Sequence, residues 1–146
     1  MISINWFECK ITTEKDVGEG KIKKCSETYL VDAMSFTEAE ARIQEEVSPF
    51  YSEFDVTNIK HAKYSELFES EEENDDKWFK VKYNCITIDD NGNEKKSALT
   101  TLVQASSLEN ALNNFKTGMR DSMIDYEIAL IQETPILDVF KLKVEE

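Results

Sequence analysis

Alternating apolar and polar residues mark two β-strands near the start of the chain, and apolar residues at helical spacing follow them. Aromatic and β-branched residues are frequent over about residues 6–14, and a second strand-like run covers about 25–33. Further along, apolar residues recur every three or four positions, which predicts a helix with one buried stripe: Phe36, Ala39, Ile43 and Val47. A third strand is expected around residues 54–56. The pattern therefore predicts the order β-β-α-β.

The same pattern occurs twice in the chain. A shift of 72 residues aligns residues 6–68 with 78–140 without a gap and gives 14 identities over 63 positions. The pair Trp6-Phe7 falls on Trp78-Phe79, and Leu30-Val31 falls on Leu102-Val103. The helical stripe recurs as well, between Leu108 and Met119. A gapless match of this length predicts a tandem duplication.

The duplication predicts an α+β fold with two antiparallel-sheet and helix halves, six strands and two helices in all. A three-stranded sheet with one helix is small for an independent fold, so we expect the halves to share a core around a pseudo-twofold axis. Each copy ends in a short apolar segment, 64–68 or 136–140. The expected domain organisation is a first repeat, an acidic linker, a second repeat and a C-terminal tail: residues 1–68, 69–77, 78–140 and 141–146.

Capping signals predict where the two helices begin. Ser35, with Glu38 three residues later, has the spacing of a capping box, in which each side chain accepts a hydrogen bond from a backbone N–H at the start of the helix. Ser106 and Glu109 offer the same box in the second copy. This second box lies one residue out of register with the first.

The cysteines do not suggest a disulfide framework. Their number is odd, and none belongs to a CxxC pair: Cys9, Cys25 and Cys85. A hairpin turn centred on Asn91-Gly92, which favours positive φ angles, would place Cys9 opposite Leu30 by the repeat alignment. We therefore expect reduced thiols.

Known catalytic motifs are missing from the chain. There is a single histidine, His61, and no Gly-rich phosphate loop, GxSxG elbow or HExxH motif. A zinc site has no CxxC scaffold to build on. We expect a protein that is not an enzyme, with no catalytic residues, no metal ligands and no cofactor.

Composition narrows the class of protein. With 40% hydrophobic and 10% aromatic residues the chain can bury a core, so it is not a disordered protein. No apolar run approaches the roughly 18 residues that span a bilayer. The first residues lack a basic, signal-like stretch, so we expect a cytoplasmic protein without a membrane partner.

Charge is unevenly distributed along the chain. Thirty acidic and seventeen basic residues give a net charge of −13, which argues against general attraction to nucleic acid or anionic membrane. The hairpins, residues 6–34 and 78–106, hold nine lysines and nine acids, so the net negative charge lies elsewhere. Six acids crowd the eight residues between the repeats: Glu69, Glu71, Glu72, Glu73, Asp75 and Asp76. This segment is a solvated connector, a weak site for a divalent cation, or the binding surface for a basic protein partner.

The hairpins suggest an alternative binding surface. Lysines recur beside the Trp-Phe pairs, and aromatic faces interleaved with cations on strands are what single-stranded nucleic acid requires. The residues of this candidate surface are Trp6, Lys10, Lys23, Lys24, Trp78, Lys82, Lys95 and Lys96. The competing interpretation is a pair of core aromatics with lysines on the solvent face of each hairpin, because strand alternation places Trp6 and Phe7 on opposite faces.

Several stretches together resemble a family catalogued only as a domain of unknown function. They are NWFECK at residues 5–10, YLVDAMSFTEAEARI at 29–43, IKHAKYSELF at 59–68, LVQAS at 102–106 and DVF at 138–140. Members of that family occur in Bacteroides-type bacteria and in their phages and mobile elements. The resemblance covers nearly the whole chain up to residue 140. It implies a cytosolic protein encoded by a phage or mobile element, and it transfers no activity.

The leading hypothesis is a non-enzymatic accessory protein that binds a protein partner through its acidic surface, as proteins for host takeover or against host defence do. One alternative is a single-stranded nucleic-acid-binding protein that uses the paired hairpin faces. A further alternative is a protein that binds a small nucleotide between the repeats. The sequence leaves the oligomeric state open.

Overall fold

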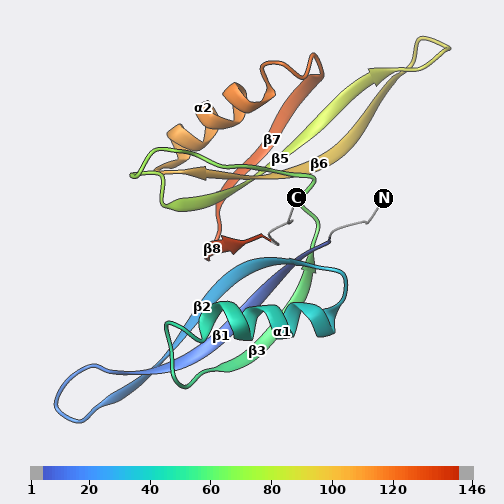
Figure 1. Cartoon of the computed structure of the whole chain (residues 1–146). Coiled ribbons are helices and arrows are strands. Elements are labelled where there is room, and N and C mark those ends of the chain that lie inside the picture. The colour runs from blue at the N-terminus through green and yellow to red at the C-terminus, as the bar shows by residue number, and fades with distance from the viewer. Residues whose placement is uncertain (1–4, 142–146) are drawn as a thin grey trace. The chain divides into compact units, whose positions relative to one another are not determined.

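The computed structural model describes residues 5–141, and these residues form two compact units. The second unit is one continuous stretch, Tyr64–Thr134, whereas the first unit combines the chain before it with the chain from Pro135 onward. Within the described residues, each unit contains one helix and four strands (Figure 1). The units therefore differ from the two sequence repeats, since each unit includes one short strand from the other repeat.

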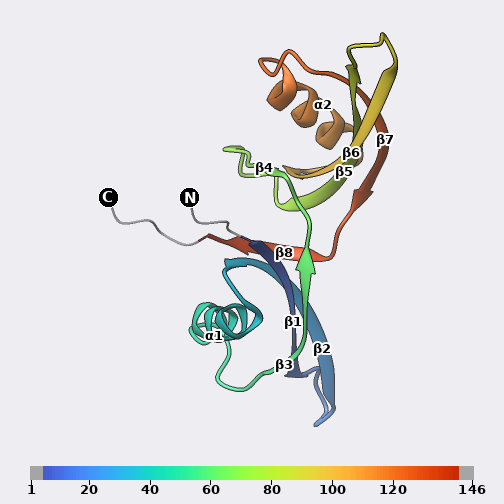
Figure 2. The same ribbon diagram turned by 90° about the vertical axis from the view of Figure 1, so that its right-hand side faces the viewer.

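The first unit packs one helix against one face of a sheet with the strand order β3-β1-β2-β8 (Figure 2). Strand β1 is antiparallel to both β2 and β3, and β8 is parallel to β2. The elements of this unit are β1 (Asn5–Asp16), β2 (Ile22–Ala33), α1 (Phe36–Val47), β3 (Asp55–Ala62) and β8 (Ile136–Phe140).

The second unit repeats this arrangement with the strand order β4-β6-β5-β7. Strand β5 is antiparallel to β6 and β7, and β4 is parallel to β6. Its elements are β4 (Glu66–Phe68), β5 (Lys77–Ile88), β6 (Glu94–Ala105), α2 (Leu108–Met119) and β7 (Asp125–Glu133). The α+β class and the duplicated β-β-α-β pattern are confirmed.

The short apolar segments that close the repeats are strands, and they are exchanged between the repeats. Strand β4, from the first repeat, pairs with β6 of the second, with Phe68 opposite Val103. Strand β8, from the second repeat, pairs with β2 of the first, with Phe140 opposite Val31. The described chain therefore has eight strands, two more than the six expected.

Each exchanged strand completes the hydrophobic core of the unit that it joins. In the first unit, Phe140 packs against a buried cluster between α1 and the sheet that includes Phe7, Ile11 and Ile43. In the second unit, Phe68 packs against a cluster that includes Phe115. Both repeats thus contribute apolar side chains to the core of each unit, which raises the apolar area that either sheet can bury.

The hairpin turns are longer than the sequence analysis expected. The turn after β5 runs over residues 89–93, where the Asp89 N–H donates to the Asn93 carbonyl at 2.9 Å and Gly92 has φ of 80°. Because the loop has five residues, the pairing of β5 with β6 is shifted by one residue from the pairing that a turn centred on Asn91-Gly92 would give. In the first hairpin, Cys9 consequently lies opposite Tyr29, and the expected pairing with Leu30 was wrong.

The N-cap of α1 is the residue predicted from sequence, and the N-cap of α2 lies one residue later than predicted. Ser35 caps α1, and its hydroxyl accepts a hydrogen bond from the Glu38 N–H at 3.1 Å. In α2 the cap is Ser107, which accepts from the Asn110 N–H at 3.1 Å, and the prediction of Ser106 was wrong. The Ser106 hydroxyl instead accepts a hydrogen bond from the Asn110 side chain at 3.1 Å. The two caps are therefore in register between the repeats.

Candidate functional site

The acidic segment, residues 69–76, is held to helix α2 by one buried carboxylate. Asp75 is only 6% exposed, and its Oδ1 accepts a hydrogen bond from Asn110 Nδ2 at 2.7 Å. Its Oδ2 accepts from Asn114 Nδ2 at 3.3 Å and from the Ser70 hydroxyl. Asp75 is thus an anchor of the segment rather than part of its exposed surface.

Further hydrogen bonds fix the backbone of the acidic segment near both of its ends. The Ser70 N–H donates to Gln104 Oε1 on β6 at 2.9 Å, and the Asp75 N–H donates to the Glu72 carbonyl at 3.1 Å. The remaining acids of the segment have exposed side chains: Glu69, Glu71, Glu72, Glu73 and Asp76. A backbone fixed at both ends therefore carries five exposed carboxylates. Fixed charges act on a partner at a smaller cost in ordering than charges on a mobile chain.

The first unit has an equivalent attachment built from different residues. Arg42 on α1 occupies the position of Asn114, and Asp32 occupies that of Gln104. The Arg42 guanidinium bonds the Asp32 carboxylate at 2.5 Å and the Asp32 carbonyl at 2.9 Å. It also donates to the carbonyl of Phe140, the last residue of β8, at 3.4 Å. Helix α1 therefore holds the last residue of β8, whereas α2 holds the segment that follows β4.

The lysines of the nucleic-acid hypothesis are exposed, but one of its two tryptophans is not. Trp78 is 4% exposed, whereas Trp6 is half-buried. Lys96 forms an ion pair with Glu127 at 2.9 Å, which offsets its charge locally. All six lysines have exposed side chains: Lys10, Lys23, Lys24, Lys82, Lys95 and Lys96. The hairpins thus offer cations for phosphates and one partly accessible indole for stacking.

A polar cluster lies where the β1–β2 hairpin meets the loop after α1. The Glu27 carboxylate accepts hydrogen bonds from the hydroxyls of Tyr29 at 2.6 Å and Tyr51 at 2.5 Å, and it forms an ion pair with Lys15 at 3.4 Å. Burial opposes ionisation of Glu27, but these donors together outweigh it and lower its pKa. Burial and the bond to Glu27 raise the pKa of Tyr29. The cluster stabilises an ionised carboxylate between two neutral phenols.

Two side chains with potential for catalysis or metal binding, Cys9 and His61, pack in the first unit. Cys9 is fully buried, and burial, with a smaller effect of Glu8, raises the pKa of its thiol to about 12. The His61 ring packs on Phe7 with ring centres 5.4 Å apart. Among residues 5–141, no group of three or more His, Cys, Asp or Glu side chains is arranged to hold a metal ion.

Both described helices have 12 residues, and neither is long and apolar enough to cross a membrane.

Sequence reasoning missed the anchoring role of Asp75 and the polar cluster around Glu27. In sequence, Asp75 looks the same as its exposed acidic neighbours. Only in the folded structure do its hydrogen bonds to the side-chain amides of α2 distinguish it. A usable signal was the departure from the repeat: Arg42 is replaced by Asn114, and Glu27 by Leu99. The first replacement matches the different attachments made by α1 and α2, and the second leaves the second unit without the carboxylate of the Glu27 cluster.

A comparison with protein-family models matches residues 5–142 to a domain of unknown function, DUF4494. No curated protein and no solved structure matches the chain.

Proposed function

We propose that this chain, which belongs to the DUF4494 family of domains of unknown function, is a non-enzymatic protein that binds a basic protein partner. The binding surface in this proposal is the acidic segment of the second unit. The observation that carries it is the burial of Asp75 between Asn110, Asn114 and Ser70, which anchors the segment while its other carboxylates remain exposed.

Electrostatic attraction supports this choice of partner. Exposed carboxylates gathered on one anchored segment create a local negative potential, which speeds encounter with a basic surface and repels other acidic ones. The chain as a whole carries a net charge of −13, so its long-range field has the same sign. A partner that normally binds nucleic acid through a basic groove fits this chemistry.

The proposed setting is a phage or mobile element of Bacteroides-type bacteria, with the protein acting in the cytoplasm of the host. In that setting the partner would be a host protein, and occupying its basic groove would block a defence or redirect host machinery. This setting follows from the resemblance in sequence, and the choice of partner follows from charge.

The test removes three exposed charges from the segment without touching its anchor. The triple variant E71Q/E72Q/E73Q keeps Asp75, and the control E40Q/E45Q/E109Q removes three exposed charges from the two helices. Full-length proteins capture partners from host lysate, and affinity for the purified partner is then measured at low and high salt. We expect a loss of about tenfold or more for the segment variant and little change for the control. Equal affinity for both variants would rule out the acidic segment.

Single-stranded nucleic-acid binding is the second candidate, and the six exposed hairpin lysines favour it. Lys10 and Lys82 occupy equivalent positions on β1 and β5, and the others lie towards the hairpin tips. In this case oligonucleotides should quench the fluorescence of Trp6 at low salt, and added salt should release them. Unchanged fluorescence together with no salt-sensitive binding would remove this candidate.

A further inference from the structure

The first unit contains an open pocket with a volume of about 810 Å³, beside the half of the β1–β2 hairpin nearer its tip. Its walls come from the end of β1, from β2, from the loop that joins α1 to β3, and from the start of β3. Phe50 on this loop lines the pocket and is 71% exposed. An exposed aromatic ring at a pocket wall is available to stack on a ligand.

The duplication supplies an internal comparison for this pocket. In the second copy, Lys96 and Glu127 form an ion pair at 2.9 Å, and Asn84 donates to Glu127 at 3.3 Å. Their counterparts in the first copy, Lys24 and Asp55, line the pocket instead. Among the described residues, the side chains of Lys24 and Asp55 have no ion pair or hydrogen bond. Two charged side chains that are paired in the second copy are therefore unpaired in the first copy.

A buried hydroxyl in the pocket lining also lacks a partner. Thr13 lines the pocket and is 3% exposed, and its Oγ1 makes no hydrogen bond in the described structure. Buried polar atoms in native proteins are nearly always satisfied, so an orphaned hydroxyl beside a pocket points to a polar partner that enters it. Its counterpart in the second copy is Cys85, which has little need of such a partner.

The charges of the lining favour a cationic ligand. Glu14 and Lys24, opposite each other on β1 and β2, form no ion pair in the described part of the chain, but as one acid and one base they add no net charge to the lining. Glu53 and Asp55 remain as two further carboxylates in the lining, which also includes Phe50. A planar cation that stacks on an aromatic ring and donates forked hydrogen bonds to carboxylates satisfies this arrangement.

We propose that this pocket binds the guanidinium group of an arginine side chain presented by the protein partner. The inference rests on the proposed function for the source of the arginine, since a basic partner displays such side chains. It adds a specific contact in the first unit to the charge attraction of the acidic segment. The pocket and the acidic segment can be tested by separate variants.

The experiment measures binding of a small probe, N-acetyl-arginine amide, to the full chain by chemical-shift perturbation of backbone amides. The expected result is saturable shifts confined to the pocket lining, around Thr13 and residues 50–57. The citrulline analogue, a neutral isostere, should cause none of them. Absence of shifts, or equal affinity for citrulline, would overturn the proposal, as would pocket binding of adenosine monophosphate in preference to the arginine probe.

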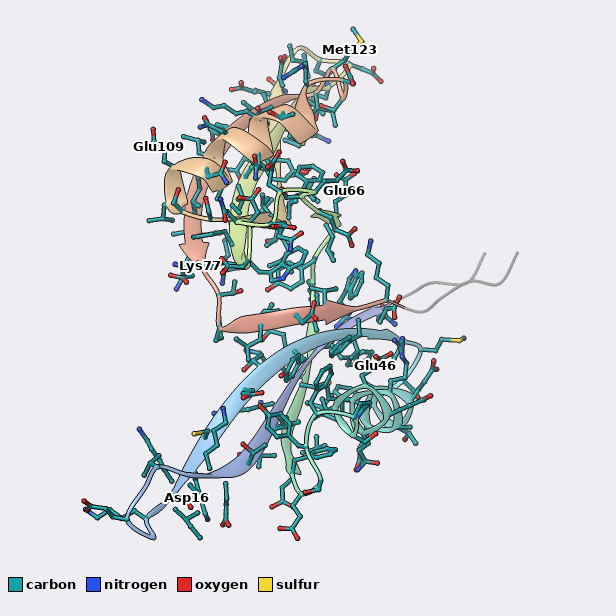
Figure 3. All side chains as sticks on the ribbon, turned by 60° about the vertical axis from the view of Figure 1, so that its left-hand side comes forward. Asp16, Glu46, Glu66, Lys77, Glu109 and Met123 are labelled. Carbon is teal, nitrogen blue, oxygen red and sulfur yellow. The ribbon has the colours of Figure 1, made fainter. Side chains whose placement is uncertain are left out.

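Variants of the pocket lining, compared with a control variant in the second copy, test whether the probe binds in the pocket. We expect the double variant E53Q/D55N to weaken probe binding by about tenfold and F50A by less. The control D125N/M123A changes two exposed residues after α2, namely Met123 on the loop (Figure 3) and Asp125, the counterpart of Glu53 at the start of β7. It should leave probe binding unchanged, and an equal loss in this control would contradict the pocket assignment.

The two proposals fail in different ways. The segment variant E71Q/E72Q/E73Q should bind the arginine probe normally while losing partner affinity. If the probe does not bind but partner capture still depends on the acidic segment, the pocket proposal is wrong and the proposed function stands. If the probe binds and the segment variant keeps full partner affinity, the acidic segment is not the surface that the partner uses.

Discussion

The ring of Phe68 lies directly against Gly118 of α2, so that a methyl group at position 118 would come within 2.7 Å of two ring carbons. Phe68 ends the exchanged strand β4, and Gly118 lies one residue before the end of the helix. The counterpart of Gly118 in α1 is Glu46, so the first unit seats Phe140 in another way, stacked on Tyr29 with ring centres 5.5 Å apart. Close approach at Gly118 is therefore specific to the docking of β4.

Replacing Gly118 with alanine tests this docking, because two effects of opposite sign compete. Helix propensity alone predicts that G118A stabilises the protein by about 1 kcal/mol. The clash with the Phe68 ring predicts destabilisation by about 1–3 kcal/mol. We expect the clash to prevail and the midpoint of urea unfolding to fall. F68L should lower the free energy of unfolding less in the G118A background than in the wild type, because the smaller side chain also relieves the clash. If G118A were instead more stable than the wild type, the Phe68 ring would be free to move away.

Arg42 is expected to hold the end of β8 to the first unit. The substitution R42K keeps the charge but loses the forked donors that reach Asp32 and the Phe140 carbonyl, so unfolding should become easier by about 1–2 kcal/mol. Hydrogen exchange of the amides of β8 should accelerate more than that of β1. The control is R120K, at an exposed arginine just after α2. Faster exchange in β1 with β8 unchanged would contradict the attachment.

The local elements could be predicted from sequence because their signals are local. Alternation in residues 6–14, the apolar stripe from Phe36 to Val47 and the Ser35 cap each depend on near neighbours. The exchange of β4 and β8 could not be predicted in this way. The strands end in similar residues, Leu67-Phe68 and Val139-Phe140, so either could pair within its own repeat by pattern alone. Long-range packing, including the contact with Gly118, distinguishes the two pairings.

The candidate site was predictable in composition but not in geometry. The density of acids in residues 69–76 is visible in the sequence, whereas the burial of Asp75 depends on two asparagines 35 and 39 residues away. The pocket around Phe50 likewise joins β1, β2, β3 and a loop. Its sequence signal is a difference between the repeats, since Phe50 and Tyr51 are replaced by Ser122 and Met123.

The anchor of the acidic segment predicts a large effect at one acid and a small effect at its neighbour. D75N exchanges a buried carboxylate that accepts three hydrogen bonds for a neutral amide, which should destabilise the second unit by about 1.5–3 kcal/mol. D76N removes the same charge from an exposed side chain and should change stability by less than about 0.5 kcal/mol. Chemical denaturation measures both. Equal effects would mean that Asp75 anchors nothing.

Thiol reactivity should differ between the cysteines of the native protein. Cys9 is fully buried and burial raises its pKa to about 12, so both its access and its thiolate population are low. Cys25 and Cys85 are partly exposed. A chromogenic disulfide reagent should therefore leave Cys9 unmodified until denaturant is added, as peptide mass mapping can check. Rapid modification of Cys9 without denaturant would contradict its burial.

The Glu27 cluster predicts stability changes at both ends of the pH range. The pKa of Glu27 is lowered on folding, so its stabilising contribution is present above the ordinary carboxyl pKa of about 4.3 and is lost as the pH falls through the lower folded value. The pKa of Tyr29 and of Tyr51 is raised on folding, so their contribution is present below about 10 and is lost as the pH rises through the folded values.

The substitution E27Q separates this cluster from general effects of pH. It removes the carboxylate that helps to raise the pKa of both phenols, so their ionisation, followed by absorbance at 295 nm, should begin at a lower pH than in the wild type. The acid-induced loss of stability should shrink as well. E14Q removes a nearby exposed acid that has no part in the cluster and should leave the tyrosine titration unchanged. Identical titrations for E27Q and the wild type would mean that Glu27 does not control these phenols.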